Sequence, residues 1–141
     1  MLDAPTTDKD FYFRLAAIAF ALNWVWEVLQ MFAYQTKWEE SWRDTALFCT
    51  LATIIDVLII LFIFKLVKKF ILERGAKFYL ATALLGVLSA VVIEIVAVGL
   101  GLWSYDATMP QVPLIKVGVL PFLQLMLLTP ATVWLSSRAI P

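Results

Sequence analysis

The sequence predicts an all-α integral membrane protein, a bundle of four transmembrane helices in a single domain. Two observations about composition indicate this fold class. Hydrophobic residues make up 62% of the 141 residues, and the mean hydropathy is +0.88, whereas soluble globular proteins contain roughly 45–50% apolar residues. A domain of this size cannot bury that much apolar surface in its own core, so lipid is the expected solvent.

Four apolar segments supply the third observation, because each is long enough to cross a bilayer, which takes about 20 residues. The third segment has Glu94 as its only charged residue. The fourth is interrupted by Pro121 and Pro130, and we expect a kinked helix there, since neighbouring groups in a membrane can satisfy the freed carbonyls. The predicted spans cover residues 12–34, 46–66, 78–103 and 114–135.

The distribution of basic residues predicts the orientation. Eight of the 11 Lys and Arg residues lie on the side of the two tails and of the connection between the second and third spans, and three lie on the opposite side. Cytoplasmic loops carry an excess of Lys and Arg, so both termini are expected in the cytoplasm. The expected location of the protein is a bacterial inner membrane. The eight residues are Lys9, Arg14, Lys65, Lys68, Lys69, Arg74, Lys77 and Arg138.

The first outer loop, residues 35–44, is expected to form a short interfacial helix. Thr36 and Glu39 have the spacing of a capping box, and Trp38 and Trp42 follow one turn apart. This helix would be either an anchored connector or a lid over the outer mouth of the bundle. An aromatic belt is expected at the same interface. It comprises Trp38, Trp42, Trp103 and Tyr105, with Tyr34 just inside.

Polar side chains occur in all four spans. Those on the first span are spaced i, i+4 and i+7, so they share one helical face. At a rise of about 1.5 Å per residue, one polar residue on each span lies roughly 10–16 Å below the outer interface. We therefore expect a single polar chamber in the outer half of the bilayer. Its expected residues are Asn23, Glu27, Gln30, Asp56, Glu94 and Gln124.

The three acids of this chamber are the candidate catalytic residues. A carboxylate at mid-membrane costs roughly 2.5–3.5 kcal/mol on insertion scales, a penalty that an amide linking two helices would avoid. We assign Glu27 and Glu94 as the acid–base pair and Asp56 as their orienting partner. The amide side chains of Asn23, Gln30 and Gln124 are expected either to bind ligand or to form hydrogen bonds between helices. Such bonds stabilise a membrane bundle by about 0.6–2 kcal/mol each.

Three aromatic residues are further ligand-binding candidates. Trp24 and Trp26 lie on different faces of the first helix, so one is expected to contact lipid or another subunit and the other to wall the chamber. Aromatic rings beside carboxylates attract a cationic ligand or a carbocation. Tyr105 belongs to a second outer loop stiffened by two prolines, and it is expected to reach toward the site together with Asp106.

Several classes of site have no signal in the sequence. There is no histidine, the usual metal ligand and general base at neutral pH, and Cys49 is the single cysteine. No phosphate loop, dinucleotide fingerprint or thiolate cluster is present, so neither a cofactor nor a metal site is expected. The chain has no basic stripe of the kind that nucleic acids require.

Three functions remain open on these observations. One is an acid–base enzyme of the isomerase, cyclase or hydratase type that acts on a lipophilic or isoprenoid substrate. When carboxyl groups cluster in an apolar environment, some of them keep their proton while another stays ionised, and paired acid–base catalysis needs both forms. The second is a non-catalytic subunit of a larger membrane complex, or a homo-oligomer, that binds lipid, pigment or quinone.

The third function is a proton-coupled transporter of small molecules. In its four spans and in the position of Glu27 on the first span, the chain resembles the small multidrug resistance exporters. That resemblance implies a dimer that exchanges protons for aromatic cations. Three intramembrane acids rather than one, and a different local sequence around Glu27, depart from the pattern of that family.

Overall fold

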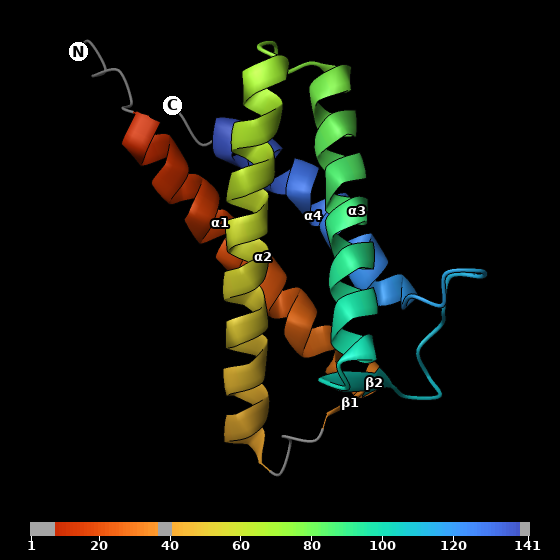
Figure 1. The fold of residues 1–141 in the computed structure, drawn as a ribbon. Helices are drawn as coiled ribbons and strands as arrows, with labels where there is room; N and C mark the ends of the chain where they lie inside the picture. The colour runs from red at the N-terminus through yellow and green to blue at the C-terminus, as the bar shows by residue number, and fades with distance from the viewer. Residues whose placement is uncertain (1–7, 37–40, 139–141) are drawn as a thin grey trace.

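The computed structural model describes residues 8–36 and 41–138 and contains four long helices (Figure 1). Helix α1 covers Asp8–Gln30 and continues as a 3-10 turn, η1 (Met31–Ala33). Helices α2, α3 and α4 cover Trp42–Phe70, Ala76–Gly99 and Val119–Arg138. All four are long and apolar enough to cross a membrane, as expected for a four-helix membrane bundle.

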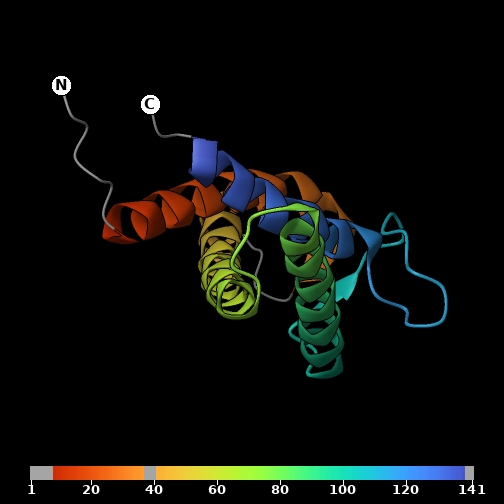
Figure 2. The ribbon, with the colours of Figure 1, turned by 90° about the horizontal axis from the view of Figure 1, so that it is seen from above.

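The four helices form two layers. In Figure 2, α2 and α3 are seen nearly end-on, and α1 and α4 lie obliquely across one side of this pair. Helix α1 packs on α2 and α4, and α3 packs mainly on α4. The start of α1, the 71–75 connection and the end of α4 lie at one end of the bundle (Figure 1). We call this the basic end, because it carries the basic residues around that connection.

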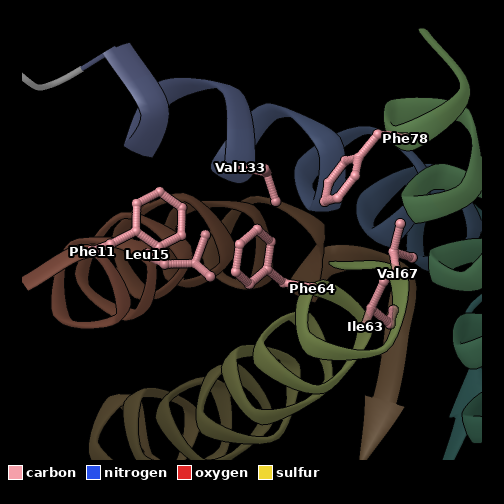
Figure 3. Packing of buried hydrophobic residues seen from close by; sticks show 7 residues of the cluster. All are labelled: Phe11, Leu15, Ile63, Phe64, Val67, Phe78 and Val133. Carbon is pink, nitrogen blue, oxygen red and sulfur yellow. The ribbon is translucent and has the colours of Figure 1, made fainter. Parts of the chain in front are cut away.

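An apolar core fills the bundle near the basic end (Figure 3). Its aromatic centre is Phe64, whose ring centroid lies 5.1 Å from that of Phe11 and 6.0 Å from that of Phe78. A second apolar cluster consists of Ala19, Ile60, Ala90 and Leu125, all 3% exposed or less. The residues of the first cluster are Phe11, Leu15, Ile63, Phe64, Val67, Phe78 and Val133.

A two-stranded antiparallel sheet lies at the opposite end, which we call the sheet end (Figure 1). Strand β1 (Tyr34–Thr36) follows η1, and strand β2 (Trp103–Tyr105) follows α3, with Tyr34 opposite Tyr105. The sequence analysis did not predict these strands. They connect the two segments expected to form the outer loops, and so place three aromatic side chains together.

Helix α3 ends at Gly99, four residues before the end of the predicted span 78–103. Gly101 has a φ of 68°, in the left-handed region that glycine adopts without a steric penalty. The amide of Leu102 donates to the carbonyl of Ala97 at 2.9 Å, which is the bond of a Schellman motif at a helix C-terminus. The prediction was too long because the chain stays apolar after the helix has ended.

Helix α4 begins at Val119 and not near residue 114 as predicted. Leu114 and Lys116 have φ values of 76° and 57°, which are not helical. Pro121 therefore lies in the first turn of α4, where a backbone N–H has no intrahelical partner to lose. The predicted interruption at Pro121 is wrong. Pro130 does lie inside the helix, and α4 continues past it.

The interfacial helix predicted over residues 35–44 is not confirmed. Its beginning belongs to strand β1, and its end belongs to α2, where Trp42 is 76% exposed. Residues 37–40, which include Trp38 and Glu39, lie outside the described residues.

Helix α2 has its own N-terminal cap. The Ser41 hydroxyl accepts a hydrogen bond from the backbone amide of Asp44 at 3.3 Å and donates one to the Asp44 carboxylate at 2.7 Å. Side chains paired in this way satisfy backbone groups that the first turn leaves free. The capping signal predicted at Thr36 belonged to the separate interfacial helix, and Thr36 lies in strand β1.

Candidate functional site

A hydrogen-bonded cluster of carboxyl and amide groups lies between α1, α2 and α4. Its centre is Gln124, which is 2% exposed. The side-chain nitrogen of Gln124 lies 2.8 Å from Glu27 Oε1, 2.8 Å from Asp56 Oδ2 and 3.1 Å from Asn23 Oδ1. Gln30 donates to Gln124 Oε1 at 2.9 Å and to Glu27 Oε1 at 3.0 Å. These five residues, each predicted for the chamber, lie together.

Glu27 and Asp56 form the acidic part of this cluster. Both carboxyl groups lie 2.8 Å from the same side-chain nitrogen of Gln124. Two carboxyl groups this close repel each other when both are ionised, which favours a proton shared between them. The Gln124 nitrogen has only two hydrogens to offer its three acceptors, so the shared proton supplies a donor that the amides lack. The pair is thus arranged as a proton-bearing unit.

Glu94 lies apart from the cluster and is held by aromatic side chains. Its carboxylate accepts hydrogen bonds from Tyr105 Oη at 2.6 Å, Tyr34 Oη at 3.2 Å and Trp103 Nε1 at 3.3 Å. Burial, together with Glu94 itself, raises the pKa of both tyrosine hydroxyls, which therefore stay protonated and donate. Three donors suit an ionised carboxylate, because in that form both oxygens only accept.

A cavity of about 180 Å³ joins the two groups. Glu27, Asp56 and Glu94 all line it, while most of the other lining side chains are apolar. Two of these, Leu51 and Ile55 on α2, are also 53% and 52% exposed on the surface of the bundle. The cavity therefore extends from the buried carboxyl groups to the apolar surface of α2 that a membrane would cover.

The predicted aromatic candidates differ in position. Trp24 is 36% exposed and donates to the Thr50 hydroxyl at 3.2 Å, away from the cavity. Trp26 donates a hydrogen bond to Gln30 Oε1 at 3.1 Å and so contacts the polar cluster, but it does not line the cavity. One of the two tryptophans was expected to line the chamber, but neither lines the cavity. Tyr105 reaches the site through its hydrogen bond to Glu94.

Two residues of the site, Tyr34 and Trp103, were missing from the predicted set. Both line the cavity and bond to Glu94. The sequence analysis assigned them to an interfacial belt, because aromatic residues at the end of a span are typical of one. The short runs around them, each with aromatic residues directly after a helix, are compatible with strands, and pairing those runs would have moved both rings to the site.

Among the residues that the structure describes, no three His, Cys, Asp or Glu side chains come together as ligands for a metal ion. Comparisons with protein-family models, with curated proteins and with solved structures found no match for this chain.

Proposed function

We propose that the protein takes a lipophilic molecule from the bilayer into the cavity and acts on it by acid–base chemistry. The observation that carries this proposal is that three carboxyl groups line a mostly apolar cavity that extends to the exposed surface of α2. An apolar cavity with a few convergent polar groups is the usual form of a small-molecule site.

The three acids suit different roles in such chemistry. The carboxyl groups of Glu27 and Asp56 meet at one amide nitrogen, and with a proton between them they can act as the general acid. Glu94, which accepts three hydrogen bonds, can act as the base. Two carboxyl environments that favour opposite protonation states are the pattern of paired acid–base catalysis. Isomerisation, cyclisation or hydration of an isoprenoid or a similar unsaturated lipid would use both.

The packing favours this function over transport. A transporter must expose its site alternately to both sides of the membrane. Here the polar cluster is separated from the basic end by two apolar clusters, whose members are 8% exposed or less. The cavity is lined by residues from the sheet end and the middle of the bundle.

Deuterium incorporation tests the catalytic proposal even while the substrate is unidentified. Protein in lipid nanodiscs is incubated in D2O with a lipid extract of its host, and the lipids are analysed by mass spectrometry. An enzyme that moves protons to or from carbon will introduce deuterium into one lipid class. Glu27→Gln and Glu94→Gln should abolish this incorporation, whereas Glu73→Gln, an exposed acid at the basic end, should not.

A second candidate function is binding without chemistry. It is favoured by the hydrogen bonds that the Glu27 and Asp56 carboxyl groups already make to Gln124 and, for Glu27, to Gln30. In that case a lipid, pigment or quinone would copurify with the wild-type protein and carry no deuterium after the incubation. Absence of both a bound lipid and incorporation would contradict both functions.

We also propose that both termini face the cytoplasm of a bacterial cell. The described ends of the chain lie at the basic end (Figure 1), and basic residues are retained on the cytoplasmic side. A C-terminal green fluorescent protein fusion should fluoresce, and the matching alkaline phosphatase fusion should be inactive. The opposite pair of results would reverse the orientation.

A further inference from the structure

The cavity walls carry acidic groups without a basic counterpart. Three of its 16 lining residues are acidic, and none of these described residues is Lys or Arg. The salt bridge between Lys68 and Asp8 lies at the basic end, away from the cavity. An anionic head group entering this cavity would meet like charges in a medium of low dielectric constant, where repulsion is strong.

Glu94 is the acid best placed to meet a charged ligand. Its three partners are neutral donors, so they orient the carboxylate without cancelling its charge. It is 4% exposed, and water therefore screens it little. A buried carboxylate without a cation is costly, and a ligand that carries a positive charge would offset this cost.

Aromatic rings surround the same part of the cavity. The ring centroids of Tyr34 and Trp103 lie 6.1 Å apart, and those of Phe48 and Trp103 lie 5.9 Å apart, both pairs with an interplanar angle of 89°. All three residues line the cavity beside Glu94. Faces of aromatic rings attract ammonium groups, and desolvation strengthens the attraction.

We propose that the ligand is a cationic amphiphile, with a single ammonium head group held by Glu94 and the rings of Tyr34, Phe48 and Trp103. Its hydrocarbon part lies along the apolar walls and extends past Leu51 toward the bilayer. This inference rests on the proposed function, in which the cavity takes up a lipophilic molecule. The head group would occupy the Glu94 side. Glu94 would then hold this charge instead of acting as the base, and the carboxyl pair Glu27 and Asp56 would stay free for proton transfer.

Photocrosslinking with three matched probes tests the head-group charge. Each probe has the same alkyl chain with a diazirine and an alkyne, and the head group is trimethylammonium, hydroxyl or sulfonate. The protein is placed in nanodiscs of uncharged galactolipid, so that no lipid head group competes or concentrates a probe by charge. Mass spectrometry measures labelling of the cavity walls relative to exposed positions on α3, such as Leu84 and Leu88.

The ammonium probe should label the cavity about tenfold more than the hydroxyl probe, as expected for a cation among desolvated rings, and the sulfonate probe should label it least. Glu94→Gln should reduce the preference to about twofold or less, since the amide keeps a hydrogen-bonding oxygen but loses the charge. Trp103→Leu should reduce it in part. Glu73→Gln, the matched exposed acid, should leave it unchanged.

Equal labelling by the ammonium and hydroxyl probes in the wild type would overturn the cationic ligand and leave the proposed function intact. A preference that survives in both Glu94→Gln and Trp103→Leu would also overturn it. If no probe labels the cavity above the exposed positions, the proposed function fails as well.

Discussion

The amide of Gln124 holds the polar cluster together, and replacing it with an apolar side chain tests this directly. Gln124→Leu keeps most of the volume and removes the amide contacts with Asn23, Glu27, Gln30 and Asp56. The amide has two hydrogens to donate and accepts one bond, so three full hydrogen bonds are lost. At ~0.6 kcal/mol for each interhelical bond in a membrane, the loss is about 1.8 kcal/mol. Acceptors left without donors in the core add to this cost, so a decrease of about 2–4 kcal/mol in the free energy of unfolding is expected.

Unfolding in mixed micelles, with sodium dodecyl sulfate as the denaturant and far-UV circular dichroism as the signal, measures this free energy. The matched control is Gln111→Leu, the same change at an exposed position in the loop before α4. Exposed substitutions of this kind usually change stability by less than about 0.5 kcal/mol. If Gln124→Leu stays within that range of the wild type, the amide does not organise the cluster, and the roles given to Glu27 and Asp56 lose their support.

Three further outcomes are expected. Gly86→Ala would place a methyl group 2.9 Å from a backbone carbon of α4, which must then move at least 0.5 Å to reach an ordinary contact of 3.4 Å. Overpacking of this kind should lower the free energy of unfolding in micelles by about 1–3 kcal/mol. The control Gly99→Ala meets nothing within 4 Å and should leave this free energy unchanged. Tyr105→Phe keeps the ring and loses the 2.6 Å bond to Glu94, so thermal unfolding should show a loss of about 1–3 kcal/mol, and an unchanged midpoint would contradict the bond. The pKa of Asp106 is lowered from 3.8, first by a hydrogen bond from the backbone of Thr108. Its carboxylate therefore stabilises the fold above pH 3.8, and the excess stability of the wild type over Asp106→Asn should disappear as the pH falls through the lowered pKa.

The helical elements and their buried faces follow from the order of residues along the chain. Asn23, Glu27 and Gln30 recur at helical spacing, and all three are buried on one face of α1. Asp56 shares its face with Thr53 and Cys49 in the same way. Periodicity predicts such faces because, in a long apolar helix, a polar side chain avoids lipid only by turning inward.

The ends of the helices were less predictable. Hydropathy does not distinguish a helical residue from an apolar residue in a turn or strand, so Trp103 was included in the third span although β2 contains it. The wrong prediction of an interruption at Pro121 has the same cause. A proline interrupts a helix only when it lies beyond the first turn, and hydropathy alone does not place the helix start at Val119.

By itself, the sequence determined four helices long and apolar enough to cross a membrane, with polar residues on their buried faces. Only the tertiary structure decided how they divide, with Glu27 and Asp56 meeting at Gln124 while Glu94 is held by tyrosines and a tryptophan. The reason is physical. Burial faces depend on local helical spacing, whereas hydrogen-bond partners depend on how the helices cross and on the β1–β2 pairing, which joins residues about 70 positions apart.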